Sequence, residues 1–190
     1  MSASNAKKNN AKIITIVYIA LMSAITAALS QIAIPLPTGI PITLQTFAVS
    51  LAGFLLGPIF GTVSIVVYIA LGAIGVPVFS SFGAGIGKLI GLTGGFIWGF
   101  IPFSALCGVG ARIEHIRRTK LASILSLVTA TIGLLICHIF GSAQYAALSG
   151  NGFGKSFLLV SVPYLIKDVL SVIAAWMLAK VLRKCVKLPF

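Results

Sequence analysis

Long apolar stretches separated by clusters of basic residues are the feature that most constrains the fold of this 190-residue chain. Hydrophobic residues make up 58% of it and charged residues only 8%, whereas about a quarter of a typical soluble domain is charged. The sequence therefore predicts an all-α integral membrane protein. The basic clusters are Lys7, Lys8 and Lys12, then Arg112, Arg117, Arg118 and Lys120, and finally Lys180, Arg183, Lys184 and Lys187.

The positions of these clusters predict the topology. Loops rich in Lys and Arg stay in the cytoplasm, so an even number of spans must separate consecutive clusters, and both termini are expected to be cytoplasmic. The apolar chain before the middle cluster has room for four spans of roughly 20 residues, and the chain after it has room for two. We therefore predict a six-helix membrane domain at 13–183, between cytoplasmic tails at 1–12 and 184–190. The expected spans cover about 13–34, 42–57, 60–76, 94–110, 121–146 and 161–183.

Turn signals support this division of the chain. The sequence "GPIFG" (57–61) is expected to turn on the inner side between spans two and three, and "ARIEHIRRTK" (111–120) is expected to form the basic inner loop. The outer side then receives the loops 35–41, 77–93 and 144–158 together with the start of the last span. We expect these segments to converge on one outward-facing pocket.

Asp168 is the most informative single residue, because it is one of only two acidic residues and lies inside the last apolar stretch. A charged residue inside a span is costly and usually marks a site, although a structural pairing is the alternative. Helical spacing places Tyr164, Asp168 and Ser171 on one face, whereas the adjacent Lys167 points about 100° away. We therefore expect Lys167 and Asp168 to contact two parts of a ligand, rather than each other. An N–H donor for Asp168 and an anionic or carbonyl oxygen for Lys167 describe a small amphipathic anion.

Two further patterns suggest contacts. Aromatic residues near the outer loops are candidates for the apolar walls of the pocket, with core packing or a membrane-interface belt as the alternative. Small residues at Ala20, Ala24 and Ala28 lie one helical turn apart and favour close helix approach, either within the chain or with another membrane subunit. The aromatic candidates are Phe79, Phe82, Tyr145 and Tyr164.

Several function classes find little support. "FGAGIGKL" (82–89) lacks the first Gly and the final Ser or Thr of a phosphate-binding loop, so ATP hydrolysis is not expected in this chain. His115 and His138 are isolated and interpreted as structural, and the three cysteines predict neither a disulfide nor a metal site. We expect no catalytic residues, no cofactor and no metal. The grouping of basic residues between apolar runs favours a lipid bilayer over nucleic acid as the partner of this charge.

Taken together, three segments resemble the BioY family, the biotin-specific substrate-binding (S) components of energy-coupling-factor (ECF) vitamin transporters. The segments are "IPITLQTFAVSLAGFLLGPIFG" (40–61), "YIALGAIGVPVF" (68–79) and "LTGGFIWGF" (92–100). The resemblance implies a six-helix S-component fold in a bacterial cell membrane, with biotin as ligand. It also implies two kinds of partner, a transmembrane coupling (T) subunit and a pair of cytoplasmic ATPases.

The resemblance also assigns roles to residues. It adds Thr43, Gln45 and Gln144 to the candidate substrate-binding residues, and it favours Ala20, Ala24 and Ala28 as the face that docks on the T subunit. Pro163, Tyr164 and Asp168 match the pattern of the family near the last span. Four positions depart from that pattern: Leu92 replaces a common Pro, Gln144 a frequent Trp, Lys167 the usual Gly, and Ser171 an expected Lys.

These departures leave the role of the basic group open. Asp168 is expected to accept hydrogen bonds from the ureido N–H groups of biotin, and charge-assisted bonds of this kind are strong. The ligand carboxylate is expected at Lys167 or at another cation or polar group near the outer loops. Alternative functions are an S component for a different vitamin, a non-catalytic membrane assembly subunit, and an intramembrane enzyme.

Overall fold

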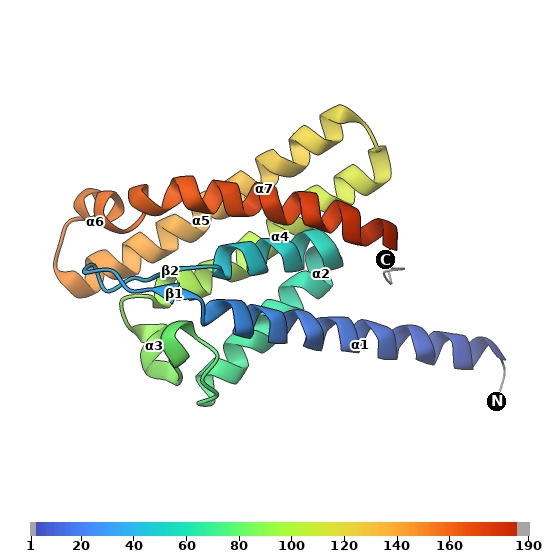
Figure 1. Ribbon diagram of the computed structural model, residues 1–190, viewed down its shortest axis with the longest axis horizontal. Coiled ribbons are helices and arrows are strands. Elements are labelled where there is room, and N and C mark those ends of the chain that lie inside the picture. The colour runs from blue at the N-terminus through green and yellow to red at the C-terminus, as the bar shows by residue number, and fades with distance from the viewer. Residues whose placement is uncertain (1–2, 186–190) are drawn as a thin grey trace.

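The computed structural model describes residues 3–185, with side chains from residue 9 onward except residue 11. The chain forms a bundle of long helices with the short elements gathered at one end (Figure 1). The long helices are α1 (Ala3–Ser30), α2 (Gln45–Ala73), α4 (Gly94–Arg117), α5 (Lys120–Ser149) and α7 (Val162–Cys185). The short elements are β1 (Ala33–Ile34), β2 (Ile42–Thr43), the 3-10 helix η1 (Ser80–Phe82), α3 (Ile86–Ile90) and α6 (Phe153–Val160).

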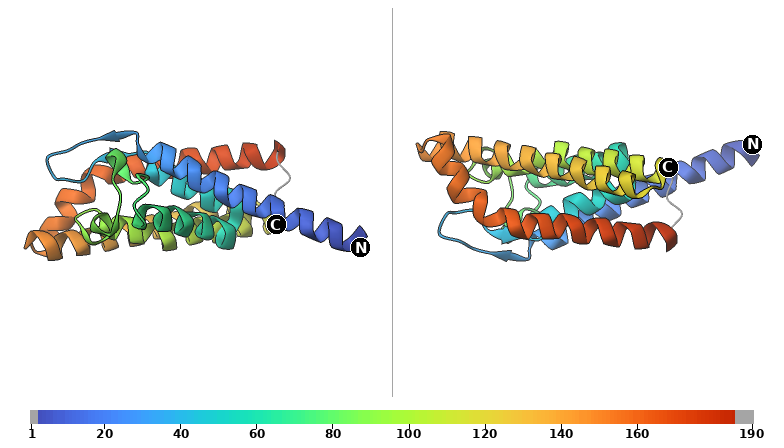
Figure 2. Two further views of the ribbon diagram at one scale, coloured as in Figure 1. Left: turned by 90° about the horizontal axis from the view of Figure 1, so that it is seen from below. Right: turned by 90° about the horizontal axis from the view of Figure 1, so that it is seen from above.

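The two ends of this bundle differ in structure. The loop end carries β1, β2, η1, α3 and α6, and the terminal end carries the start of α1, the α4–α5 turn and the last turns of α7 (Figure 2). Lys7 and Lys8 by their side chains, and Lys187 with the rest of the tail beyond residue 185, lie outside the described residues. Their predicted placement in the cytoplasmic tails stays a prediction.

Helix α2 consists of two helices folded back on each other. Gly57 has φ +78° and ψ −178°, a conformation that interrupts the helix and that side-chain-bearing residues rarely adopt, and Pro58 follows it. In a straight helix, residues 45 and 68 would lie roughly 35 Å apart. Instead, Nε2 of Gln45 donates a 2.8 Å hydrogen bond to the hydroxyl of Tyr68. The chain therefore reverses at Gly57, where the sequence predicts a turn.

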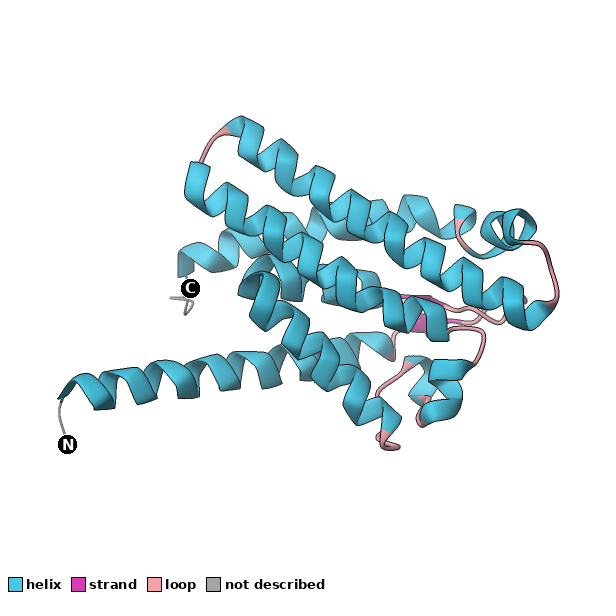
Figure 3. Cartoon of the chain, turned by 180° about the vertical axis from the view of Figure 1, so that it is seen from behind, coloured by secondary structure: helices cyan, strands magenta, loops and turns pink. Residues whose placement is uncertain are grey.

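The loop end consists of a two-stranded ribbon, short helices and the loops that connect them (Figure 3). Prolines at 35, 37 and 41 prevent a helix after α1, and the chain forms a two-stranded antiparallel ribbon in which Ala33 pairs with Thr43. Helices α6 and α7 meet at Ser161 with a bend of 52°. The predicted loop at 77–93 contains η1 and α3, and part of the predicted loop at 144–158 forms α6.

The basic loop predicted at 111–120 is corrected by the structure. Helix α4 continues through Arg117, and the turn consists only of Arg118 and Thr119 before α5 begins. Arg118 takes a left-handed conformation, and Thr119 caps α5 by accepting a hydrogen bond from the backbone N–H of Ala122. The helices extend beyond the apolar stretch because the basic residues are good helix formers, so hydropathy alone underestimates their length.

The apolar residues divide between a core and an outer surface. Val49, Phe54 and Tyr68 of α2 and Phe103 of α4 belong to one buried apolar cluster, whereas large apolar side chains are exposed on α1, α5 and α7. Within the described residues, four helices are long and apolar enough to cross a membrane, and the bent pair of α6 and α7 makes a possible fifth. These observations show a mostly helical, multi-pass membrane protein.

Glu114, the second acidic residue, joins three helices at the terminal end. Its carboxylate lies 2.6 Å from Nζ of Lys180 on α7 and accepts hydrogen bonds from Ser123 on α5 and from Nε1 of Trp176. The ammonium group of Lys180 also lies 3.7 Å from the centre of the Trp176 ring. The carboxylate of Glu114 therefore links α4, α5 and α7 through its hydrogen bonds and ion pair.

The substitution Glu114→Gln should destabilise the bundle without changing its ligand site. An amide cannot replace the ion pair, and hydrogen bonds to charged groups contribute about 1.5–3 kcal/mol each. We expect a lower midpoint of thermal unfolding in detergent, measured by tryptophan fluorescence. Ser149→Ala, at the opposite end of α5, is the control that should leave the midpoint unchanged. An equal midpoint for Glu114→Gln and the parent protein would contradict this role.

Candidate functional site

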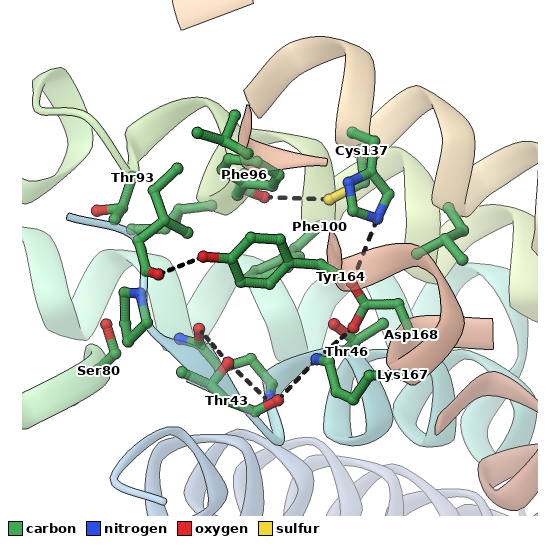
Figure 4. A pocket seen from close by; sticks show the side chains of 17 residues that line it. Thr43, Thr46, Ser80, Thr93, Phe96, Phe100, Cys137, Tyr164, Lys167 and Asp168 are labelled. Atoms are coloured by element: carbon green, nitrogen blue, oxygen red, sulfur yellow. Dashed lines mark hydrogen bonds and ion pairs between the residues drawn. The ribbon is translucent and has the colours of Figure 1, made fainter. Parts of the chain in front are cut away.

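A pocket opens among the helices at the loop end (Figure 4). Its lining comes from segments far apart in the sequence: the ribbon and the start of α2, the first turns of α4, the middle of α5, and the first turns of α7. The charged residues of the lining, Lys167 and Asp168, come from α7, and polar residues from the ribbon and the start of α2 adjoin them: Thr43, Gln45 and Thr46. Ser80 and Thr93 lie on the side of the pocket away from Asp168 (Figure 4). The pocket therefore combines an apolar wall with a charged side.

The apolar wall is formed mainly by α4 and α5. Phe96, Ile97 and Phe100 project from the first turns of α4, and Leu134 and Cys137 face them from α5. Glycines allow this close approach: a Cβ on Gly99 would lie only 2.7 Å from the Cα of Cys137. The wall thus depends on small residues that bring α4 and α5 together and turn their larger neighbours toward the pocket.

Asp168 is the centre of the charged side. Its side chain is 7% exposed, and its carboxylate contacts two basic residues, Lys167 and His138. Nε2 of His138 lies 3.2 Å from Oδ2, while the ammonium group of Lys167 contacts Oδ1. A buried carboxylate carries a large desolvation cost unless it is paired in this way. These two contacts allow the carboxylate of Asp168 to remain charged in a pocket that is otherwise largely apolar.

The contact between Lys167 and Asp168 corrects a prediction. Helical geometry predicts that the two adjacent residues point in different directions and contact different parts of a ligand. The long Lys167 side chain instead bends back to Asp168, and its ammonium group also donates a 2.9 Å hydrogen bond to the carbonyl of Thr43. The direction of a Cα–Cβ bond does not limit a flexible four-carbon side chain, which explains the difference.

His138 is the site residue that sequence reasoning missed. It is 2% exposed, and its Nδ1 lies 3.0 Å from the hydroxyl of Ser161, which is itself 2.8 Å from the hydroxyl of Ser142. If Nε2 carries the proton donated to Asp168, then Nδ1 accepts from Ser161, so these contacts are consistent with one tautomer. A histidine within a span was the available signal, since ionisable residues there commonly mark sites.

Polar residues at the mouth hold the ribbon over the pocket. The hydroxyl of Tyr164 donates a 2.6 Å hydrogen bond to the carbonyl of Ile40, and Thr38 lies 3.2 Å from the same hydroxyl. Thr43 donates to Oε1 of Gln45, and the amide of Gln45 in turn donates to Tyr68. Of the predicted site residues, Thr43, Gln45, Tyr164, Lys167 and Asp168 therefore line one pocket.

The structure places the other four predicted site residues outside this pocket. Phe79 is buried in the core, where its ring packs edge-on against Tyr68 at 5.6 Å, and Phe82 is 71% exposed. The amide of Gln144 donates to the carbonyls of Leu89 and Gly91 and so supports α3. Tyr145 is partly buried and packs against the cluster that contains Tyr164. Phe79, Phe82 and Tyr145 were selected for their proximity to the outer loops and Gln144 through the family resemblance, and neither criterion specifies whether a side chain enters the pocket.

The three alanines of the proposed docking stripe lie elsewhere. Ala20, Ala24 and Ala28 are on α1, and all three are exposed. The opposite face of α1 carries the buried residues Met22 and Thr26, and Ser23 donates a 2.7 Å hydrogen bond to the carbonyl of Ser64. The stripe therefore does not mediate the contact between α1 and α2, which was the alternative interpretation.

Long apolar helices around a pocket that has an apolar wall and a paired buried carboxylate define a membrane protein suited to binding a small molecule. The chain belongs to the BioY family, whose model matches residues 4–188. This match spans nearly all of the described residues, including every element that lines the pocket.

Relatives and a solved structure agree with this assignment. A protein of Pyrococcus horikoshii named as a probable biotin transporter is 36% identical over 162 residues, 85% of this chain and 91% of that protein. The biotin transporter of Rhodobacter capsulatus is 30% identical over 171 residues, 85% of this chain and 89% of that protein. The crystal structure of an S component for biotin from an ECF-type ABC transporter superposes with a TM-score of 0.79 at 28% identity. That match covers 93% of this chain and 94% of the other.

Proposed function

We propose that this chain binds biotin and serves in its uptake as the substrate-specific component of an ECF-type ABC transporter. The observation that carries the proposal is the paired carboxylate of Asp168 inside an apolar pocket, in a chain that belongs to the BioY family. Biotin has an apolar ring system and aliphatic chain between a ureido group and a carboxylate. Such a ligand matches a pocket with an apolar wall and a charged side.

The contacts of Asp168 suggest how the ligand is oriented. A ureido group presents N–H donors beside a carbonyl acceptor, and Asp168 and Lys167 together offer an acceptor and a donor at adjacent points. Both residues are thus assigned to the ureido end. The ligand carboxylate lies at the far end of the molecule, so it requires another group. The hydroxyls of Ser80 and Thr93 line the side of the pocket away from Asp168 and are assigned to it (Figure 4).

The fold and the charges support a membrane arrangement with six spans. The two halves of α2 count as separate spans, and α6 with α7 forms one bent span, which makes six spans within 13–183. The basic clusters support a cytoplasmic position for the terminal end and for the tails 1–12 and 184–190, and the proposed membrane is that of a bacterial cell. The loop end and the biotin pocket then face the outside.

The proposed partners are a T subunit in the membrane and a pair of ATPases in the cytoplasm. The exposed stripe of Ala20, Ala24 and Ala28 on α1 is assigned to contact with the T subunit, because small side chains allow two membrane helices to approach closely. In this arrangement the chain itself performs no catalysis, and the energy for transport comes from ATP hydrolysis in the partners.

Calorimetric titration of the ligand-free, detergent-purified chain with biotin and a panel of other vitamins tests the proposal. Saturable binding that is selective for biotin is the expected result. A response to another vitamin alone would keep the architecture and overturn the substrate. No heat with any vitamin, for protein shown to be folded, would favour a membrane assembly subunit, and recovery of chemically altered ligand would favour an enzyme.

The substitution His138→Gln should weaken biotin binding by roughly tenfold, through loss of a charge-assisted contact that orients the carboxylate of Asp168. Titration calorimetry measures this change. The matched control is Ser142→Ala, which alters the same buried hydrogen-bond chain one turn away but leaves the contact with Asp168 in place. Equal losses of affinity in both variants would show that His138 contributes only through general packing.

A further inference from the structure

A second concave site lies at the terminal end, between the α4–α5 turn and the last turns of α7. Among its lining residues are the basic side chains of Arg118, Lys120, Lys180 and Lys184, together with the carboxylate of Glu114. Arg118, Lys120 and Lys184 are exposed, whereas Lys180 pairs with Glu114. Cations outnumber the carboxylate in this groove, so it attracts anions.

Helix α5 adds to the positive potential of the groove. Thr119 caps the helix and lines the groove with Lys120 and Ser123, so the N-terminus of this 30-residue helix lies at its edge. A helix N-terminus carries a partial positive charge and unpaired N–H groups, which favour a phosphate. The side-chain cations and the N-terminus of α5 therefore both contribute positive potential to this groove.

Exposed apolar side chains adjoin the lining residues of the groove in sequence. Leu121 and Ile124 are 61% and 57% exposed on the first turns of α5, and Val181 is 58% exposed on α7, next to Lys180. Hydrogen bonding between Lys180 and Ser123 brings these two helices together at this level. A water-soluble anion would use the cations only. A ligand with a phosphate and long aliphatic chains would use both kinds of surface.

We propose that this groove binds an anionic phospholipid, with its headgroup phosphate among Arg118, Lys120 and Lys184 and its acyl chains along Leu121, Ile124 and Val181. The lipid is distinct from the ligand of the pocket at the loop end. It bridges the α4–α5 turn and α7 at the level where the basic cluster meets the apolar surface. Clusters of Lys and Arg beside membrane helices attract anionic headgroups in this way.

Trp176 provides a local probe of this site. Its indole N–H donates to Glu114 and its ring lies under Lys180, and both of these residues line the groove. The chain has two tryptophans, so Trp98→Phe leaves Trp176 as the reporter. Brominated phosphatidylglycerol and brominated phosphatidylcholine are titrated into this variant in detergent, and quenching of fluorescence measures lipid contact. We expect half-maximal quenching at about tenfold less phosphatidylglycerol than phosphatidylcholine.

Charge variants decide whether the preference belongs to the groove. The double substitution Lys120→Gln and Lys184→Gln should raise the phosphatidylglycerol needed by about tenfold or more. The control, Lys12→Gln with Lys155→Gln, removes the same charge from exposed positions outside the groove and should retain the preference. Biotin titration of each variant verifies that the bundle is folded and separates this test from that of the proposed function.

Three outcomes would overturn the inference. Equal quenching by the two lipids in the parent protein means that no anionic headgroup is selected. Equal loss of preference in the control variant means that total charge, rather than the groove, attracts the lipid. Displacement of brominated phosphatidylglycerol by millimolar inorganic phosphate means that the groove binds soluble anions, because a lipid held also by its acyl chains resists such competition.

Discussion

The substitution Asp168→Asn is expected to lower the affinity for biotin by roughly 100-fold or more. The amide has the size of the carboxylate but carries no charge, so it offers weaker hydrogen bonds to the ureido N–H groups. It also leaves Lys167 as a half-buried cation without its counter-ion. Truncating one partner of a buried charge pair costs about 2–5 kcal/mol, which corresponds to this range of affinity. Titration calorimetry on the detergent-purified variant measures the change.

Glu114→Gln is the matched control for this prediction. It makes the same chemical change at the other acidic residue, near the C-terminal end of α4, whereas the pocket lies at the N-terminal end of that helix. We expect its biotin affinity to stay within about threefold of the parent value, although its stability is lower. Affinity retained in Asp168→Asn would remove Asp168 from the binding site, and equal losses in both variants would point to general destabilisation.

The substitution Ala24→Trp should abolish biotin uptake while leaving biotin binding intact. Ala24 lies at the centre of the exposed alanine stripe on α1, on the face opposite the buried residues that hold α1 in the bundle. An indole at this position prevents close approach of a second helix, and such contacts between membrane helices depend on small residues. Co-purification with the T subunit and uptake of labelled biotin are measured beside calorimetric binding.

The control places the same bulk on another exposed face. Ile132 lies on α5 and is 48% exposed, so Ile132→Trp tests whether any large side chain on the outer surface disturbs the complex. We expect the control to assemble with the T subunit and to transport biotin normally. Normal assembly of Ala24→Trp would place the docking face elsewhere on the chain.

Much of the architecture is predictable from the sequence, because apolar length and basic clusters constrain a membrane protein strongly. The prolines of 35–41 and the Gly57–Pro58 pair mark real interruptions, since neither residue type continues a helix easily. The limits of α4 and α5 are less predictable. Hydropathy assigns Arg112 and Arg117 to a loop, whereas in the structure both residues belong to α4, which continues beyond the apolar stretch.

The part of the site that could be predicted is the residue whose burial is energetically costly. The contacts that depend on helix rotation or on side-chain conformation could not be predicted. A carboxylate within an apolar span is energetically costly unless other groups pair with it, so the position of Asp168 in the sequence indicated a functional site. The partner contact from His138 on α5 depends on how two helices are rotated about their axes, which no local pattern specifies. The turn of Lys167 onto Asp168 depends on the conformation of a flexible side chain. Gln144 is a residue that the resemblance assigned to the site but whose hydrogen bonds, in the structure, support α3.

The reversal of α2 at Gly57 has a consequence for how the protein is made. Residues 13–87 contain no charged side chain, so the turn at Gly57 carries no cation to hold it on one side while the chain leaves the ribosome. We therefore expect the two halves of α2 to insert as a pair, with their direction set by the lysines before residue 13 and by the cluster of arginines in α4, which outnumbers the single cation Lys88 between them. Moving either group of charges is expected to affect the insertion of a hairpin that lies far from both.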